Sequence, residues 1–353
     1  MKNSKPKISM VIMSYNGGKR LIPTLESHKL QTYKDKELII SDDASPDGIT
    51  PKIIEDWLSE NEHFFKRVIF IKNEVNVGAV NNFRNAVSHA TGDVIFQTEQ
   101  GDVIYGPETI ELISNEIEKQ RLNGLRDPYI WLGHFKSFLV KNGVKKEVVF
   151  QVSAKRDFDL IEKYPDKALG KMLRANFIGG ASLIFSSSYF DGDVFPHPET
   201  IKNLGDYPCL LWNLIYKKRI GIIRQFIRWY EFGAGISSRP NEKMNSDVEA
   251  MILWLETLSS GLEKRYKDIA VIKKEYGLNC KTHWQRMARH PFIFTGNALK
   301  YLMRRFKYIV RRFGEALHHK QRWIIEAEKE SSPSFEEEKF SFQYYPDKPD
   351  GIF

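Results

Sequence analysis

The chain has 353 residues and a mass of 41.1 kDa, enough for one large core with an appendage or for two domains. No apolar run approaches the ~18 residues that span a bilayer, and the only two cysteines argue against a disulfide framework or a cysteine-based zinc site. The first residues lead into an apolar run without a secretory signal, so we expect a cytoplasmic protein.

Strand and helix signals alternate through the first 120 residues. β-branched apolar runs predict strands over 8–13, 37–41, 68–72 and 93–97. Amphipathic patterns predict helices over 19–31, 51–59, 80–90 and 107–120. This alternation indicates βαβ units and therefore an α/β fold with a mainly parallel, Rossmann-like sheet flanked by helices.

The pattern changes after Pro128. Apolar segments 129–140 and 144–152 flank Asn142-Gly143, which is a strong hairpin-turn signal. A further strand is expected over 181–185, and helices are expected over 206–216 and 247–258. The last residues, 326–353, are acidic and polar, which is typical of a flexible tail.

Polar groups follow each of the first four predicted strands. They occur in four short segments, Ser14-Tyr15-Asn16, Asp42-Asp43, Asn73 to Gly78, and Glu99-Gln100-Gly101-Asp102. Ligands of open α/β sheets bind past the carboxyl ends of parallel strands, so we expect the four segments on one rim. A tyrosine for stacking and acids for ribose, base or metal suit a nucleoside diphosphate, whereas isolated acidic loops are usually only solvated.

These segments resemble family 2 glycosyltransferases. The resemblance rests on Val11-Ile12-Met13-Ser14-Tyr15-Asn16, Ile39 to Gly48, Asn76-Val77-Gly78, Arg84-Asn85-Ala86 and Ala90-Thr91-Gly92-Asp93. It covers roughly residues 7–120, and a weaker match extends over 179–185, 205–208 and 230–237. It implies a GT-A fold and an inverting transferase that moves a sugar from a nucleotide-sugar donor to an acceptor hydroxyl.

The resemblance also implies roles for individual residues. Tyr15 and Asp43, with Asp42 beside it, match positions that hold the nucleobase and ribose. The nucleotide-binding set that we expect is Ser14, Tyr15, Asn16, Asp42, Asp43, Asn76, Gly78, Arg84 and Glu99. Gly17-Gly18-Lys19-Arg20 lacks the spacing of a phosphate-binding loop and is not counted as one.

The family places an Asp-x-Asp metal motif at the end of the fourth strand, where a divalent ion neutralises the diphosphate leaving group. Here Gly101 stands at the usual second acid, so the resemblance implies Asp102 as the ligand of Mn²⁺ or Mg²⁺, supported by Glu99. The general base of the family corresponds to Asp206, with Gly205 where an acid often stands. Read alone, an Asp before a helix is more often an N-cap than a catalytic residue.

Nine Lys or Arg and one acid, Glu315, lie between residues 286 and 320, an excess that equals the net charge of +8. Read as a helix, the segment has an apolar stripe through Leu299, Leu302 and Phe306 beside a basic face. This pattern predicts a helix at the surface of an anionic membrane, and the alternative is a helix packed on the catalytic domain. A nucleic-acid partner is not expected, because the acids on the rim would repel phosphate.

The expected organisation is therefore a GT-A domain over 1–280, with a nucleotide half (1–125) and an acceptor half (126–280), then a basic helical appendage (281–325) and the tail. We expect an enzyme at the inner face of the plasma membrane, acting on a glycan or lipid-linked acceptor with a UDP-sugar, while dTDP- and GDP-sugars stay open. A binding subunit without catalysis is the rival hypothesis, because Gly101 and Gly205 replace acids.

Overall fold

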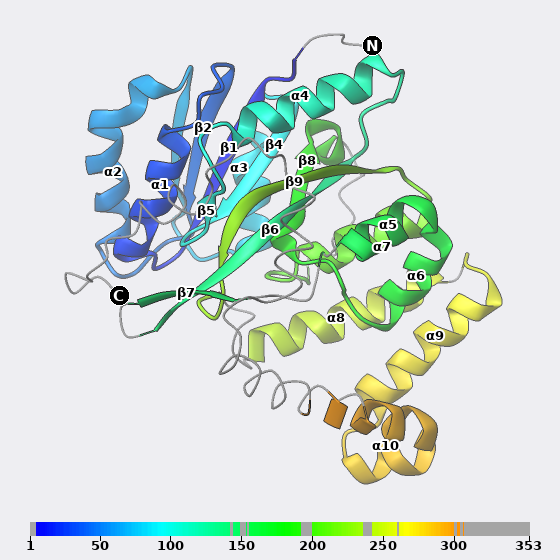
Figure 1. Cartoon of the computed structure of the whole chain (residues 1–353). Coiled ribbons are helices and arrows are strands. Elements are labelled where there is room, and N and C mark those ends of the chain that lie inside the picture. The colour runs from blue at the N-terminus through cyan, green and yellow to red at the C-terminus, as the bar shows by residue number, and fades with distance from the viewer. Residues whose placement is uncertain are drawn as a thin grey trace.

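A computed structural model describes most of the chain: residues 5–141, 144–148, 153, 155–191, 200–235, 242–259, 261–299, 302–303 and 306. Within these residues one sheet has the strand order β3-β2-β1-β4-β8-β6-β9-β5, with β7 paired to β6 (Figure 1). The strands are β1 (Ile8–Ser14), β2 (Lys36–Asp42), β3 (Val68–Lys72), β4 (Val94–Glu99), β5 (Val103–Ile104), β6 (Ile130–Lys141), β7 (Val144–Val148), β8 (Leu183–Ser186) and β9 (Ile220–Glu231).

The first four strands are parallel, as the sequence predicts, and their ends are level. In the β1–β2 pair Ser14 lies opposite Asp42, and in the β1–β4 pair Met13 lies opposite Glu99. The helices that connect these strands are α1 (Leu21–Lys29), α2 (Thr50–Asn61) and α3 (Ala79–Ser88), and α4 (Thr109–Leu122) follows β5. The expected rim of strand ends is therefore confirmed.

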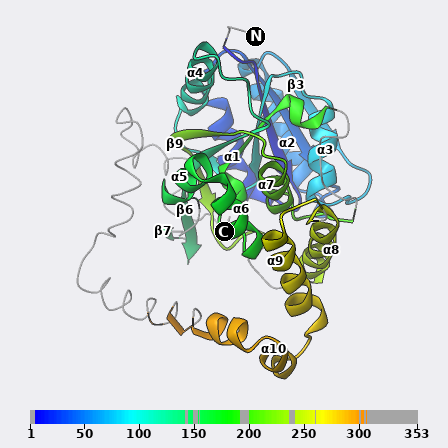
Figure 2. The ribbon, with the colours of Figure 1, turned by 90° about the vertical axis from the view of Figure 1, so that its right-hand side faces the viewer.

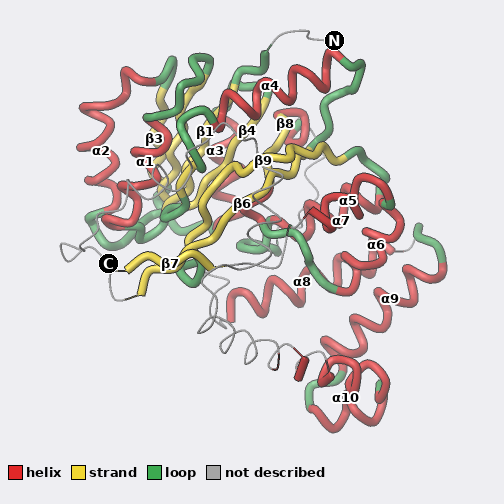
Figure 3. Tube along the Cα trace, viewed as in Figure 1, coloured by secondary structure: helices red, strands yellow, loops and turns green. Residues whose placement is uncertain are grey.

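Helices cover both faces of the sheet, and each face has its own apolar core (Figure 3). Met10 and Ile12 point to the core under α1, α2 and α4, while Val11 and Met13 point to the core on the other face. Burial on both faces is why these strands read as continuous apolar runs. The second face is covered by α3 and by α5 (Lys155–Lys163), α6 (Pro165–Arg174), α7 (Asp206–Ile215), α8 (Glu242–Ser259) and α9 (Lys264–Lys274).

The second half of the sheet is mixed. β8 runs antiparallel to β4 and β6, and β9 runs parallel to β6 and antiparallel to the short β5. β9 is not predicted from the sequence, although it brings Glu231 from the second half of the chain to the rim. Tyr207 belongs to the core on the α7 side of the sheet, and Trp212 packs against that core.

The basic segment does not begin as one continuous helix. α10 (His283–Arg289) ends at His290, whose backbone (φ −137°, ψ 59°) leaves the helical region, and residues 291–299 are helical again. No helix within the described residues is long and apolar enough to cross a membrane. Most of the basic segment beyond residue 299, and the acidic tail predicted for 326–353, lie outside the described residues.

Candidate functional site

The loop after each of the four parallel strands contains a residue with positive φ. These residues are Asn16 (53°), Ala44 (58°), Gly78 (87°) and Gly101 (93°). A non-glycine residue pays roughly 1–2 kcal/mol for this conformation, so Ala44 in particular is held there by its surroundings. Such strain gathers at functional sites. We call the strand-end segments 14–20, 42–48, 73–78 and 99–102 the rim.

Asp43 organises the third segment of the rim. Its Oδ1 accepts hydrogen bonds from Asn73 Nδ2 (3.0 Å) and the Val77 N–H (2.9 Å). Its Oδ2 accepts from Asn76 Nδ2 (2.9 Å) and the Gly78 N–H (3.0 Å). Because a carboxylate offers about four lone-pair sites, Asp43 is fully used in shaping the loop. The predicted nucleotide residue Asn76 contributes its Nδ2 to this arrangement.

Asp42 has a comparable task within its own loop. The hydroxyl and the backbone N–H of Ser45 donate to its two carboxylate oxygens at 2.5 and 2.9 Å. Ser45 Oγ in turn accepts the N–H of Asn16 at 2.8 Å, which links the first two segments of the rim. Both acids of the Asp42-Asp43 pair are buried. Their predicted contacts with a nucleoside stay predictions, and the visible role of the pair is to hold the loops.

Gln100 fixes Tyr15 at the rim, a role that the sequence did not suggest. Its Oε1 accepts the Tyr15 N–H (2.8 Å) and the Ser14 hydroxyl (3.1 Å), and its Nε2 donates to the Tyr15 carbonyl (2.6 Å). With its backbone held on both sides, Tyr15 keeps a side chain that is 40% exposed. A fixed and accessible aromatic ring is suited to stacking on a base.

Asp102 points into the protein. It is 3% exposed, and its Oδ1 accepts the backbone N–H of Glu231 at 2.9 Å. Burial raises the pKa of Asp102 to about 7, against the opposing charge of the neighbouring Arg228. Glu99, the last residue of β4, is exposed. Neither Arg228 nor Glu231 was predicted as part of this corner.

Glu231 and Arg20 lie against Gly101. Nε and Nη2 of Arg20 donate to Glu231 Oε2 at 3.1 and 2.6 Å. A Cβ atom built on Gly101 would overlap Glu231 Oε2 and would lie 2.8 Å from Arg20 Nη2. The ion pair therefore fills the space that a side chain at position 101 would need.

The acids at this corner do not fit a divalent ion as they are arranged. A metal ligand must be deprotonated and directed at the ion, whereas Asp102 is turned to a backbone N–H and Glu231 is paired with Arg20. In the part of the chain that the structure describes, no three acids, histidines or cysteines are placed to hold a metal. The metal role of Asp102 stays a prediction without support from this geometry.

Asp206 is the first residue of α7, and Gly205 is the N-cap. Asp206 therefore does not cap the helix, although its Oδ1 accepts the Tyr207 N–H (2.8 Å) and its Oδ2 accepts from Asn176 Nδ2 (3.1 Å). Burial raises the pKa of its carboxyl above the usual Asp range. A raised pKa is what a carboxylate needs to serve as a general base near neutral pH.

The segment before Asp206 lies on the rim. The Val80 N–H donates to the Lys202 carbonyl at 2.8 Å, and a Cβ on Gly78 would come within 2.9 Å of Lys202 Cβ and of its carbonyl oxygen. Asp247 of α8 holds this segment by accepting the N–H groups of Lys202, Asn203 and Leu204 at 3.1, 2.5 and 3.0 Å. Arg84 is half-buried on α3, close enough to Tyr189 to act on the pKa of that phenol.

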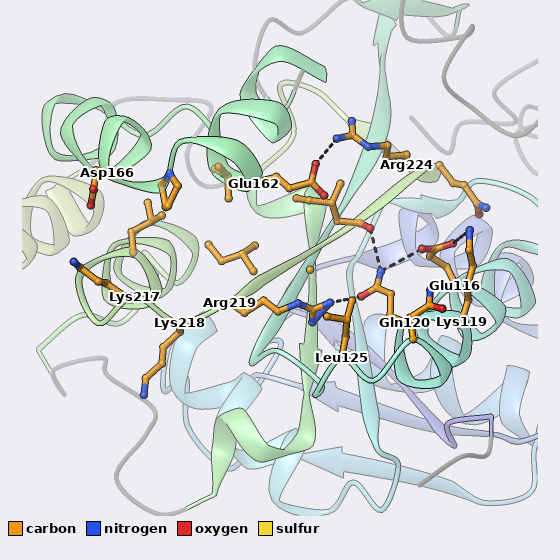
Figure 4. Close-up of a pocket in the computed structure, with 18 residues that line it drawn as sticks. Glu116, Lys119, Gln120, Leu125, Glu162, Asp166, Lys217, Lys218, Arg219 and Arg224 are labelled. Carbon is orange, nitrogen blue, oxygen red and sulfur yellow. Dashed lines mark hydrogen bonds and ion pairs between the residues drawn. The ribbon is translucent and has the colours of Figure 1, made fainter. Parts of the chain in front are cut away.

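A cavity of about 870 Å³ lies at the opposite end of β9 from Glu231 (Figure 4). It is lined by the start of β9 and by residues of α4, α5 and α6. Among its lining side chains, Arg224 donates to Glu162 (2.7 Å) and Arg219 donates to the Gln120 amide oxygen (2.7 Å). None of the predicted site residues lines it, so it is separate from the rim.

The sheet with its level strand ends, and the rim above them, define a GT-A α/β domain. Residues 9–130 match the sequence model of Glycosyl transferase family 2. The matched region is about a third of the chain, and it contains the whole rim.

Two relatives each match about a third of the chain. The putative glycosyltransferase EpsE of Bacillus subtilis (strain 168) is 36% identical over 119 residues, which are 34% of this chain and 41% of EpsE. The uncharacterized glycosyltransferase MJ1057 of Methanocaldococcus jannaschii is 31% identical over 118 residues, 33% of this chain and 39% of MJ1057. The chain thus matches about two fifths of the length of either relative.

A solved structure extends the likeness beyond the matched region. S. aureus TarS, residues 1–349, crystallised in complex with UDP-GlcNAc, has a TM-score of 0.55 and 16% identity. The similarity covers 80% of this chain and 76% of that one. At this identity the likeness concerns the fold, and it confirms the GT-A fold expected from the sequence.

Proposed function

We propose that this protein transfers a sugar from a nucleotide-sugar donor to an acceptor hydroxyl with inversion of configuration. The observation that carries the proposal is the exposed Tyr15 ring, held by Gln100 beside the loops that Asp42 and Asp43 shape, inside the family 2 region. The likeness of fold to TarS bound to UDP-GlcNAc supports a UDP-sugar as the first donor to test. dTDP- and GDP-sugars stay open, because no described contact selects a base.

In this proposal Asp206 is the general base. The acceptor hydroxyl oxygen forms a bond to the anomeric carbon while the bond from that carbon to the diphosphate breaks. The proton of the hydroxyl passes to the Asp206 carboxylate, and the nucleoside diphosphate leaves with the bonding electrons. General base catalysis of this kind is worth roughly 10²–10⁴-fold in rate.

The acceptor side of the site is linked to the donor side through the Lys202 segment. Asp43 fixes the N–H groups of Val77 and Gly78, and Asp247 fixes those of residues 202–204. The two fixed loops meet where Lys202 contacts Gly78 and accepts the Val80 N–H. This contact supports a role for Asp206 near the reacting centre, since Asp206 lies four residues after Lys202 in the chain.

We further propose that the protein works at an anionic membrane surface, where a lipid-linked acceptor would be presented. Figure 2 shows α10 projecting away from the sheet at the far end of α9. Trp284 is 76% exposed and Phe292 is 92% exposed, and Leu299, Leu302 and Phe306 are exposed as well. Exposed aromatic and aliphatic side chains among basic residues are typical of helices that lie in the membrane interface.

Vesicle binding tests the membrane proposal. The full chain should sediment with vesicles that contain an anionic phospholipid, more weakly at high salt, and poorly with neutral vesicles. Trp284→Ser with Phe292→Ser should weaken this binding, while Phe64→Ser, which removes an exposed aromatic ring from the sheet domain, should not. Equal binding by both variants would contradict the proposal, as would binding of duplex DNA in place of vesicles.

Donor turnover tests the enzymatic proposal. Purified protein is incubated with UDP-GlcNAc, other UDP-sugars, GDP-sugars and dTDP-sugars, and nucleoside diphosphate release is measured with and without a membrane extract as acceptor. Release that Asp206→Asn abolishes supports the proposal. Nucleotide binding without release under every condition would instead support the binding subunit that Gly101 and Gly205 suggest.

A further inference from the structure

The space beside Gly101 is occupied by charged side chains from other parts of the chain. A side chain at this position would overlap a carboxylate oxygen of Glu231, which reaches the corner from the end of β9. Gly101 also has φ +93°, a conformation that side chains rarely adopt. Glu231 therefore stands where the motif of the fourth strand would place its second acid.

That carboxylate is already neutralised. Nε and Nη2 of Arg20 both donate to the same oxygen, Glu231 Oε2, in a charge-assisted contact. Arg20 keeps 27% of its side chain exposed, whereas Glu231 is 8% exposed. The part of the pair that remains accessible from solvent is thus mainly cationic.

A second guanidinium lies beneath the same corner. Arg228 is buried, and its Nη2 donates to the Gln97 carbonyl at the end of β4. Its charge acts on both Asp102 and Glu99. Within the described residues, Arg228 Nε is buried without a hydrogen-bond partner. Arg20 and Arg228 therefore lie next to the acids of this corner. The side chains of these acids would have to change direction to coordinate a cation.

We propose that the guanidinium of Arg20, held by Glu231 in the space beside Gly101, meets the diphosphate of the donor in place of a divalent ion. A guanidinium can offer two parallel N–H donors to phosphate oxygens and a full positive charge. Arg20 lies in the segment that follows β1, and Tyr15 lies in the same segment. One segment would therefore contact both the base and the diphosphate. This inference rests on the proposed function and specifies how its donor site works.

Calorimetric titration of the full chain with UDP, in EDTA and then in excess Mn²⁺ or Mg²⁺, tests the inference. We expect UDP to bind in EDTA with a Kd within about twofold of that in metal. Binding that appears only with metal, or that tightens about tenfold or more with it, would overturn the inference and leave the proposed function intact. Absence of UDP, GDP and dTDP binding under both conditions would instead overturn the proposed function.

Three variants identify the group that replaces the ion. Arg20→Gln should weaken UDP binding in EDTA by about tenfold or more. Lys34→Gln, which removes the same charge from an exposed residue before β2, at the end of the strands away from the rim, should leave the Kd within about twofold. Glu231→Gln should bind UDP in EDTA at least as tightly as the parent protein, because Arg20 loses its counter-ion. The inference fails if Arg20→Gln has an unchanged thermal unfolding curve and binds UDP like the parent. It also fails if metal increases the UDP affinity of the parent but not that of Glu231→Gln.

Discussion

The backbone N–H of Glu231 donates a 2.9 Å hydrogen bond to Oδ1 of Asp102, and this bond joins positions 129 residues apart in the chain. It connects the end of β9 to the turn between β4 and β5. The same turn contains Gly101, which leaves room for the Glu231 side chain and its partner Arg20. Asp102 therefore belongs to the framework that holds the corner of the rim together.

Asp102→Asn should change how stability depends on pH. The pKa of Asp102 is about 7 in the folded protein, above its value of 3.8 when unfolded. Between these two values the folded state binds the extra proton, so this residue makes the free energy of unfolding fall as pH rises, by up to about 1.4 kcal/mol per pH unit. Asn cannot titrate but can still accept the Glu231 N–H. Urea unfolding at several pH values from about 4 to about 8 should show a shallower decline for the variant, and identical slopes would contradict this role of Asp102.

Asp43→Ala should loosen the loop 73–78. Four donors, from Asn73, Asn76, Val77 and Gly78, lose their acceptor, and each buried unsatisfied group costs about 1–3 kcal/mol before water enters. We expect faster amide hydrogen exchange across residues 73–80 and weaker UDP binding. Asp47→Ala removes a carboxylate that caps the start of α2, and it should leave exchange at 73–80 unchanged. Normal protection of that loop in Asp43→Ala would be inconsistent with the role given to Asp43.

Gly78→Ala should destabilise the protein more than Gly124→Ala. Both glycines have positive φ, 87° and 76°, so both substitutions carry a similar backbone penalty of roughly 1–2 kcal/mol. Only Gly78 adds a clash, because its new Cβ would lie 2.9 Å from atoms of Lys202, whereas nothing lies within 4 Å at Gly124. Chemical denaturation of the two variants gives the comparison. Equal losses would mean that the Lys202 segment is not held against the rim.

Asp206→Asn should abolish sugar transfer and spare nucleotide binding. The loss in kcat should be about 10²–10⁴-fold, the value of a general base, with the Kd for UDP unchanged. Because burial raises the pKa of Asp206, the parent enzyme should lose activity as pH falls through a value above the usual Asp range. Asp166→Asn, an exposed acid on α6, serves as the control. Activity that survives in Asp206→Asn would assign the base elsewhere.

The parallel half of the fold is readable from the sequence because its information is local. Buried strands such as β2 are β-branched runs between turn signals, and Asp42-Asp43 marks the point where the strand ends. The level strand ends then follow from parallel pairing alone. The position of Tyr15 at the rim could be predicted from the sequence. The hydrogen bonds with Gln100 that fix its backbone could not.

The second half resists such an approach because its interactions are long-range. β9 contains Arg224, Arg228 and Glu231, charges that suggest a solvated segment when only the sequence is known. In the folded chain Glu231 pairs with Arg20, and Arg228 lies near Asp102. Gly101 looked like a missing acid, and only the folded chain reveals that Glu231 occupies its space. Arg20 likewise had no signal of its own, since the Gly-Gly-Lys-Arg spacing matches no phosphate loop.

In the proposed site, the rim holds the nucleotide of the donor with Tyr15 against the base. Calorimetric titration of the full chain with UDP tests this arrangement directly. We expect saturable one-site binding that Tyr15→Ala weakens by about tenfold or more, since base stacking is worth roughly 1–3 kcal/mol. Tyr164→Ala, which removes another exposed ring outside the rim, should bind like the parent. Failure of UDP, GDP and dTDP to bind, or equal binding by both tyrosine variants, would contradict this arrangement.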